Sequence, residues 1–286
     1  MSLRPFAAAV LAAAHLAAAA QQPVEVPSLD RAKGKPLVLP GIWYAPPAGG
    51  AAPAMLLLHG CGGPYDSRGR LNERLRSTAS RLNAMGVGAL VVDSLTPRGE
   101  KELCTQRIGS RAVTQTQRRR DALGALQWLA AQPGVDAARL GLIGWSNGAS
   151  TVLASTNRRQ PEVADAAVKA SLAIALYPGC EADLRRGYDA VAPLLLLVGE
   201  TDDWTPAAPC QALAARAGGP APQIESYAGA YHGFDGSGAV RLRKDVPNGV
   251  HPGQGVHVGG DAAARTASAA RIDAFVRERW HLAALQ

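Results

Sequence analysis

Short apolar runs alternate with longer amphipathic stretches along most of this chain of 286 residues. Runs too short for ordinary helices, and suited to strands buried on both faces, lie at residues 55–58, 88–92, 139–143, 169–177 and 193–198. Apolar residues at helical spacing lie at residues 71–85, 111–131, 211–217 and 265–280. Such alternation specifies a mostly parallel sheet covered by helices on both faces, so the predicted fold class is α/β.

The ends of the predicted sheet carry weaker signals. Residues 36–44 have the composition of a strand, and residues 224–227 are predicted as an edge strand. Residues 21–35 are polar and contain prolines, which indicates a lead-in to the first strand. Residues 248–260 are rich in glycine and proline and are expected to form a surface loop.

The first twenty residues are predicted to be a signal peptide. Arg4 gives them a positive start, residues 6–20 are almost uniformly apolar, and alanines precede a cleavage point at Gln21. A hydrophobic content of 47% allows one well-buried core, and the length is too short for two ordinary domains. We therefore expect a periplasmic or secreted protein with a single domain over residues 21–286 and no membrane span in the mature chain.

The formal net charge of +7 arises from 30 basic and 23 acidic residues along the chain. The densest basic clusters are residues 118–120, which are all arginine, and the pair Arg185 and Arg186. Because these clusters are short and contain no aromatic residue, they favour solvated helix faces over a nucleic-acid interface. The charge predicts no nucleic-acid partner and only a weak preference for anionic ligands.

Export affects how the four cysteines are interpreted, because an oxidising compartment permits disulfides. Their spacing lacks the paired pattern of a zinc site. We favour the pairs Cys61 with Cys104 and Cys180 with Cys210, since each pair lies on segments expected at the same edge of the sheet. Free buried cysteines are the alternative.

Polar or glycine-rich segments follow five of the predicted strands, at residues 59–63, 94–104, 144–148, 178–180 and 199–203. Ligands of open α/β sheets bind at the carboxyl ends of the strands. These segments should therefore meet at one edge of the sheet and form a binding site there.

Residues 144–148 have the pattern Gly-x-Ser-x-Gly between an apolar run and a predicted helix. In this strand, turn and helix context the pattern predicts a sharp turn that presents the serine as a nucleophile. Gly144 and Gly148 stand where a side chain would collide as the chain reverses. Ser146 is therefore the candidate nucleophile.

A serine nucleophile needs a base within hydrogen-bond reach, and the base needs a carboxylate that orients it. Among the six histidines, elimination favours His232, which follows the last predicted strand. The excluded histidines are His15 in the signal peptide, His59 beside a glycine-rich turn that it can shape, His251 and His257 in the loop, and His281 at the end of the last helix.

The orienting carboxylate is predicted to be Asp202, in the turn after the strand at residues 193–198. The chain order Ser146, Asp202, His232 is that of α/β-hydrolases. Asp203 is the neighbouring alternative. Its structural interpretation is that, ahead of Pro206, its side chain caps the N-terminus of a helix.

Two backbone N–H groups are predicted to bind the oxyanion of a tetrahedral intermediate. One belongs to Asn147, which follows the nucleophile. The other belongs to the glycine-rich segment 59–63, where Cys61 is favoured and Gly62 is its alternative.

Five segments together resemble the dienelactone hydrolase family of α/β-hydrolases: residues 59–63, 97–99, 144–148, 199–206 and 231–235. The resemblance extends from Leu37 to the terminal helix and implies the α/β-hydrolase fold. The enzymes that give the family its name are similar to enzymes whose triad is Cys-His-Asp. This chain has Ser146 at the position of the cysteine nucleophile. The resemblance therefore implies a secreted serine esterase in place of a cytosolic ring-cleavage enzyme.

The predicted function is cleavage of a small-molecule carboxylic ester or lactone through an acyl-enzyme, with no metal and no organic cofactor. The candidate pocket residues are Trp145, Tyr231, Trp204 and Arg98. Plain packing is the alternative for the aromatic residues, and a surface salt bridge is the alternative for Arg98. The alternative functions are a peptidase or acyltransferase with the same triad and a non-catalytic binding module on a hydrolase fold.

Overall fold

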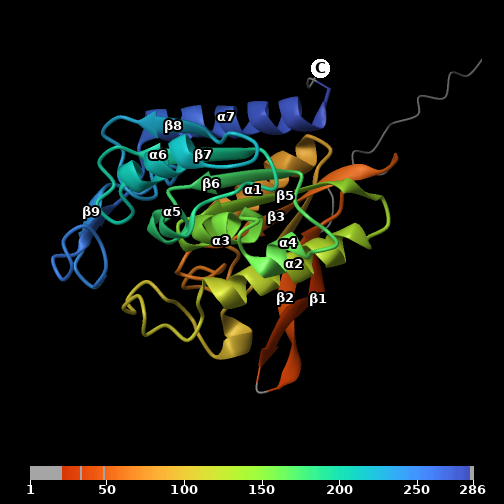
Figure 1. Ribbon diagram of the computed structural model, residues 1–286, viewed down its shortest axis with the longest axis horizontal. Coiled ribbons are helices and arrows are strands. Elements are labelled where there is room, and N and C mark those ends of the chain that lie inside the picture. The colour runs from red at the N-terminus through yellow and green to blue at the C-terminus, as the bar shows by residue number, and fades with distance from the viewer. Residues whose placement is uncertain (1–20, 33, 48, 284–286) are drawn as a thin grey trace, which may run out of the picture.

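The computed structural model describes residues 21–32, 34–47 and 49–283 (Figure 1). The predicted signal peptide, residues 1–20, lies outside the described residues. None of the described helices combines the length and the apolar character needed to cross a membrane.

An eight-stranded sheet forms the centre of the structure (Figure 1). Its strands, in spatial order, are β1 (Gln21–Ala32), β2 (Lys35–Tyr44), β4 (Gly88–Val92), β3 (Ala52–Leu58), β5 (Val135–Trp145), β6 (Leu172–Leu176), β7 (Leu194–Gly199) and β8 (Gln223–Tyr227). β2 is antiparallel to both β1 and β4, and the other neighbouring pairs of this sheet are parallel. The predicted mostly parallel sheet is confirmed.

Helices cover both faces of this sheet, as predicted. The longer ones among the described residues are α1 (Glu73–Ala84), α2 (Gln115–Ala130), α3 (Asn147–Thr156), α6 (Ala207–Arg216) and α7 (Ala262–Trp280). Buried side chains of α2, α3 and α6 pack on one face, and those of α1 and α7 pack on the other. The shorter helices are η1 (Thr96–Arg98), α4 (Pro161–Ala164) and α5 (Glu181–Arg186).

Strand β3 shows why the apolar runs form the middle of the sheet. Leu56 and Leu58 belong to the core beneath α2 and α3, whereas Met55 and Leu57 belong to the core beneath α1 and α7. Alternate residues of a strand face opposite sides, and both sides are covered here. Leu58 lies opposite Gly144 of β5, so these two parallel strands end at the same edge, where the candidate site begins.

The prediction that residues 21–35 form a polar lead-in is wrong, because residues 21–32 form the edge strand β1. Val26, Ser28 and Asp30 alternate as buried residues along it. The Ser28 hydroxyl donates to Asp121 at 2.6 Å, and Asp30 accepts from Arg98 at 2.8 Å. Inward positions that carry polar side chains conceal the hydrophobic alternation that would identify a strand.

Residues 248–260, predicted as a surface loop, contain a short strand. This strand, β10 (Val256–Val258), pairs antiparallel with β9 (Arg241–Arg243) in a separate two-stranded sheet. Three-residue strands have too few positions to show a period, so the sequence gives no signal for them.

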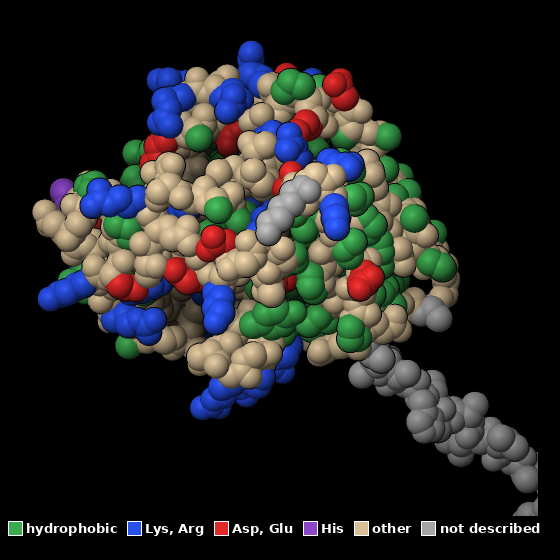
Figure 2. Space-filling model, turned by 90° about the horizontal axis from the view of Figure 1, so that it is seen from below, with side chains coloured by type: hydrophobic (Ala, Val, Ile, Leu, Met, Phe, Trp, Pro, Cys, Tyr) green, Lys and Arg blue, Asp and Glu red, His purple; other side chains and the backbone are tan. Residues whose placement is uncertain are grey.

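On the face seen in Figure 2, Lys and Arg side chains are interspersed with Asp and Glu.

Candidate active site

Ser146 stands at a sharp turn between β5 and α3, as the motif predicts. Its φ of 53° lies in the left-handed region, which is costly for a residue with a side chain. A Cβ on Gly148 would lie 2.0 Å from the Leu58 carbonyl oxygen, and one on Gly144 would lie 2.3 Å from the Gly148 oxygen. Only glycine therefore permits the close passage of the chain that exposes Ser146.

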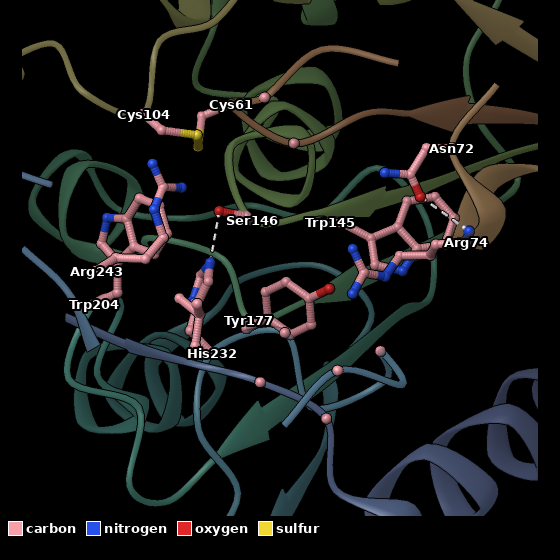
Figure 3. A pocket seen from close by; sticks show the side chains of 18 of the residues that line it. Cys61, Asn72, Arg74, Cys104, Trp145, Ser146, Tyr177, Trp204, His232 and Arg243 are labelled. Atoms are coloured by element: carbon pink, nitrogen blue, oxygen red, sulfur yellow. Dashed lines mark hydrogen bonds between the residues drawn. A yellow bond between two sulfur atoms is a disulfide. The ribbon is translucent and has the colours of Figure 1, made fainter. Parts of the chain in front are cut away.

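The structure brings Ser146, His232 and Asp202 together from three different loops. The Ser146 Oγ lies 2.9 Å from Nε2 of His232 (Figure 3). The His232 Nδ1 lies 2.8 Å from Oδ2 of Asp202. Asp202 and His232 are each 4% exposed. This line of contacts can pass a proton from the serine hydroxyl to the imidazole while the carboxylate fixes the ring.

Asp202 is held in place by its own loop. Its Oδ1 accepts from the backbone N–H groups of Trp204 and Thr205, each at 2.8 Å. The Thr205 hydroxyl lies 3.0 Å from Oδ2 of Asp202 and 3.1 Å from Nδ1 of His232. Thr205 is thus part of the site although the sequence analysis did not identify it.

Asp203 points elsewhere. Its Oδ2 lies 2.7 Å from Nδ1 of His257, and its Oδ1 accepts from the His257 backbone N–H at 2.8 Å. Asp203 therefore anchors β10 near the site. The N-cap considered for it is not formed, because no side chain caps α6.

A second carboxylate, that of the half-buried Asp235, organises the wall beside His232. It accepts from the Tyr177 hydroxyl at 2.7 Å, the Trp145 indole N–H at 2.8 Å and Nε of Arg74 at 2.8 Å. The Tyr177 ring packs against His232 with a centroid separation of 4.7 Å, and burial raises the pKa of its hydroxyl well above the usual range. Asp235 lies in the segment 231–235, but nothing in that segment indicates its partners.

The loop after β3 passes directly over the nucleophile. A Cβ on Gly60 would lie 3.4 Å from the Trp145 carbonyl oxygen and 3.7 Å from Cβ of Ser146. Among the described residues, no oxygen accepts a hydrogen bond from the backbone N–H of Cys61 or Asn147. Both predicted oxyanion donors are therefore available to a ligand.

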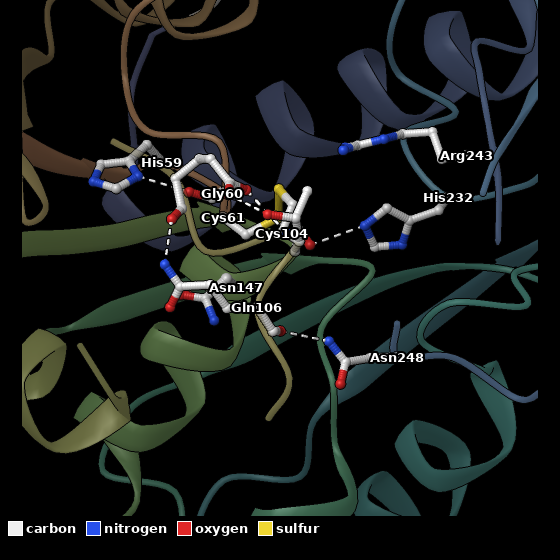
Figure 4. The surroundings of a disulfide bond; sticks show 12 residues. His59, Gly60, Cys61, Cys104, Gln106, Asn147, His232, Arg243 and Asn248 are labelled. Atoms are coloured by element: carbon white, nitrogen blue, oxygen red, sulfur yellow. Dashed lines mark hydrogen bonds between the residues drawn. A yellow bond between two sulfur atoms is a disulfide. The ribbon is translucent and has the colours of Figure 1, made fainter. Parts of the chain in front are cut away.

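His59 shapes this loop and does not act with the nucleophile. Its Nδ1 lies 2.7 Å from the Gly60 carbonyl oxygen (Figure 4). Its Nε2 accepts from the Ser94 N–H at 3.3 Å. Burial, together with the nearby charge of Arg118, holds the pKa of His59 well below its usual range. The ring is therefore neutral, with its proton on Nδ1.

Both predicted disulfides are present. Cys61 is bonded to Cys104, and Cys180 is bonded to Cys210. The first bond ties the loop that carries a predicted oxyanion donor to the loop after η1, and Figure 4 shows it beside Asn147 and His232.

Two cavities open around Ser146. One of about 400 Å³ includes Trp145, His232 and Arg243, and a second of about 550 Å³ extends past Asn147. Of the predicted pocket residues, Trp145 lines the first cavity and Trp204 lines both. Tyr231 lines neither of these two cavities, and its ring packs against His257 with a centroid separation of 5.1 Å.

Arg98 does not line the pocket, and it does not form a surface salt bridge. It is 9% exposed and pairs with Asp30 and Asp121, each at 2.8 Å. The salt-bridge interpretation of Arg98 therefore holds, but the pairs are buried and not at the surface, because Asp30 comes from the edge strand β1.

The arginines at residues 118–120 are not a solvated face either. Arg118 is fully buried, Arg119 is 7% exposed, and Arg119 and Arg120 both pair with Glu162. Arg118 donates to Oδ1 of Asn147 at 2.6 Å and to the His59 carbonyl oxygen at 2.8 Å. A buried arginine therefore contacts the elements that carry both predicted oxyanion donors.

Metal ligands are not clustered in the described part of the chain. No group of three His, Cys, Asp or Glu side chains there has the arrangement needed to hold a metal ion.

Comparison with known proteins agrees with this geometry. A search of curated protein sequences finds no significant match. A putative dienelactone hydrolase from Klebsiella pneumoniae is 19% identical with a TM-score of 0.60, over 91% of this chain and 99% of that one. A dienelactone hydrolase-like promiscuous phosphotriesterase from metagenomic libraries is 19% identical with a TM-score of 0.61, over 91% and 98%.

Esterase 2 of Thermogutta terrifontis, solved phosphoramylated by tabun, is 16% identical with a TM-score of 0.62, over 93% of this chain and 97% of that one. At these identities the three likenesses establish the shared α/β-hydrolase fold. The sequence profile of the dienelactone hydrolase family matches residues 40–274. This match covers most of the chain, which therefore belongs to the dienelactone hydrolase family.

Proposed function

We propose that this protein is a serine hydrolase that cleaves carboxylic esters, open-chain or lactone, through an acyl-enzyme intermediate. The observation that carries the proposal is the contact of Ser146 Oγ with His232 Nε2 at 2.9 Å, continued by His232 Nδ1 to Asp202 at 2.8 Å. Membership of the dienelactone hydrolase family supports the same class of reaction.

Acylation begins when Ser146 Oγ attacks the ester carbonyl carbon and its proton passes to Nε2 of His232. Asp202 keeps the other ring proton on Nδ1 and stabilises the imidazolium that forms. The carbonyl oxygen becomes an oxyanion, which the N–H groups of Cys61 and Asn147 bind.

The imidazolium then gives its proton to the alcohol oxygen as the C–O bond breaks, which leaves the acyl group on Oγ of Ser146. Water attacks this acyl-enzyme, His232 accepts a proton from the water, and the same proton returns to Oγ as the carboxylic acid leaves. These steps require no metal and no organic cofactor.

The walls of the cavity beside His232 favour an ester that carries an anionic group. Arg74, Arg241 and Arg243 line this cavity, and no Asp or Glu among the described residues does. Arg74 pairs with Asp235 and Arg243 pairs with Asp245, so Arg241 is the lining arginine that forms no ion pair among the described residues. Arg243 also lies over the Trp204 ring, 5.8 Å from its centroid. A cavity lined by one sign of charge concentrates ligands of the opposite sign, so we assign recognition of the anionic group to the arginines of β9, Arg241 and Arg243.

Esters of matched shape test this preference. The double variant Arg241→Ala/Arg243→Ala should lower kcat/KM for a p-nitrophenyl half-ester of a dicarboxylic acid, with little change for the neutral ester of equal length. Added salt should reduce the wild-type preference in the same direction. An equal loss on both esters would contradict the charge argument.

Export is the second part of the proposal. Two disulfides support an oxidising compartment, hence a periplasmic or secreted protein. The signal peptide at residues 1–20 is tested by N-terminal sequencing of the protein recovered from the periplasm or the medium. A mature chain that begins at Gln21 is expected.

A fluorophosphonate probe and short p-nitrophenyl esters test the catalytic proposal directly. We expect labelling of Ser146, a burst of p-nitrophenol and steady turnover, all of which Ser146→Ala should abolish while the fold is retained. The competing functions give different results. A non-catalytic binding module shows neither labelling nor turnover, a peptidase prefers amide substrates, and an acyltransferase needs an acceptor alcohol or amine in place of water.

A further inference from the structure

Arg118 is a fully buried charge near the nucleophile. It projects from α2, it is 0% exposed, and its guanidinium bridges two chain segments that are far apart in the sequence. One nitrogen donates to Oδ1 of Asn147 at 2.6 Å, and the other donates to the His59 carbonyl oxygen at 2.8 Å. These residues belong to the two segments that carry the proposed oxyanion donors.

Carboxylates offset this charge only at longer range, from Asp121 and Asp93. Arg118 forms no ion pair among the described residues, and its Nε has no hydrogen-bond partner there. Burial lowers the pKa of Arg118 to about 10, so the guanidinium is still protonated at neutral pH. Arg98 shows the usual arrangement for a buried arginine, because ion pairs with two aspartates neutralise its charge.

Burying a charge without an ion-pair partner costs desolvation free energy and so destabilises the fold. The expense is reduced where a negative charge develops during the reaction, because the buried cation then gains a counter-charge in a medium of low polarity. The oxyanion site, bounded by Asn147 and the segment 59–63, is such a place.

The rest of the neighbourhood reinforces the same contact. Gln115, one turn before Arg118 on α2, donates to the Asn147 carbonyl oxygen at 3.1 Å. The Thr151 hydroxyl on α3 lies 2.9 Å from that oxygen and 2.8 Å from Oε1 of Gln115. Helix α2 therefore holds Asn147 by both its side chain and its backbone, while Arg118 also holds the loop opposite.

We propose that Arg118 is a positioning residue that fixes the spacing of the Cys61 and Asn147 N–H groups and adds positive charge behind the oxyanion. This inference rests on the proposed ester hydrolysis. It assigns Arg118 to the transition state and not to substrate binding, because Arg118 lines neither cavity.

The test compares Arg118→Gln and Arg118→Lys with Arg120→Gln, which removes an arginine of the same helix that contacts neither His59 nor Asn147. Active sites are counted by fluorophosphonate titration. Kinetics use p-nitrophenyl butyrate. Inhibition is measured with a trifluoromethyl ketone, which forms a tetrahedral oxyanion on the serine, and with butyrate, which resembles the ground state.

We expect Arg118→Gln to lower kcat by roughly 10- to 100-fold per active site, less than or comparable to the loss of an oxyanion donor. KM and butyrate binding should stay within about two-fold, and the trifluoromethyl ketone should weaken in proportion to kcat/KM. Arg118→Lys should recover part of the loss because it keeps the charge. Arg120→Gln should behave as the wild type.

Unchanged kcat per active site in Arg118→Gln overturns the inference, and so does equal weakening of butyrate and the ketone. If Arg118→Gln does not fold, Asn147→Ala is used, which removes one acceptor of Arg118 and keeps the backbone N–H. It should show the same selective loss for the ketone, and a wild-type response overturns the inference. If the wild type shows neither turnover nor labelling, the proposed ester hydrolysis is refuted, and the role of Arg118 is refuted with it. A wild type that is active while Arg118→Gln keeps its kcat refutes the role of Arg118 alone.

Discussion

Removing the two disulfides separately should distinguish their effects on stability and on catalysis. The bond between Cys61 and Cys104 closes a loop with a sequence separation of 43, and the bond between Cys180 and Cys210 closes one of 30. In the chain-entropy description, loops of these lengths stabilise the fold by about 4 kcal/mol each at 25 °C. The double alanine variants should therefore lose similar free energies of unfolding.

Their activities should differ, because only one bond holds a proposed oxyanion donor. Cys61 carries that N–H, and its carbonyl oxygen accepts from the Leu103 N–H at 2.7 Å, so bond and hydrogen bond together tie it to the neighbouring loop. The Cys180–Cys210 bond links the loop after β6 to α6, and neither cysteine lines the two cavities at Ser146. We expect Cys61→Ala/Cys104→Ala to lower kcat by about 10-fold or more, within the range for a misplaced oxyanion donor.

The assay measures unfolding in guanidinium chloride and kcat at a temperature well below both unfolding transitions. Activity is expressed per site titrated with a fluorophosphonate, so unfolded protein does not count. Cys180→Ala/Cys210→Ala should keep kcat within about two-fold of the wild type while its unfolding midpoint falls. Equal kcat losses in the two variants, or a normal kcat without the Cys61–Cys104 bond, would refute the reasoning.

Three further predictions concern single positions. Asp202→Asn should lower kcat by about 10,000-fold, as for other orienting aspartates, whereas Asp203→Asn should stay active because Asp203 contacts His257; steady-state kinetics of both variants decide the assignment. Gly148→Ala should not reach the native fold, because its Cβ would meet the Leu58 oxygen at 2.0 Å, whereas Gly62→Ala meets only Sγ of Cys104 at 4.0 Å and should unfold cooperatively in circular dichroism. His59 is kept neutral by burial, with its pKa well below the value of 6.5 that it has when unfolded. Below that pH only the unfolded chain binds a proton at His59. The free energy of unfolding should therefore fall by up to about 1.4 kcal/mol for each unit by which the pH is lowered. Denaturant unfolding between about pH 7 and about pH 5 should show this slope, and His59→Gln should reduce it.

The sheet could be predicted where both faces of a strand are apolar. Residues 55–58 and 193–198 are continuous apolar runs, and both became central parallel strands. β1 was missed because Ser28 and Asp30 take inward positions, where the partners that make them acceptable come from α2 and η1. Short-range patterns do not contain such partners, since Ser28 and Asp121 are 93 residues apart.

The nucleophile turn could be predicted because its geometry is local, and the predicted order of Ser146, Asp202 and His232 agrees with the contacts that form. The side chains that form the walls of the site could not be predicted from the sequence. Asp235 joins Tyr177, just after β6, to Trp145 of β5 and Arg74 of α1. A single carboxylate in a loop gives no sign of such partners. Only long-range packing brings these groups together.

Helix α2 explains why the charge pattern was misleading. Successive residues of a helix are about 100° apart around its axis, so a run of arginines points in several directions and does not form one patch. Arg118 points into the protein toward Asn147, Arg119 and Arg120 reach Glu162, and the next residue, Asp121, pairs with Arg98. The segment that looked most like a solvated surface therefore connects the site to β1 and α4. Its buried side, and not its net charge, relates it to catalysis.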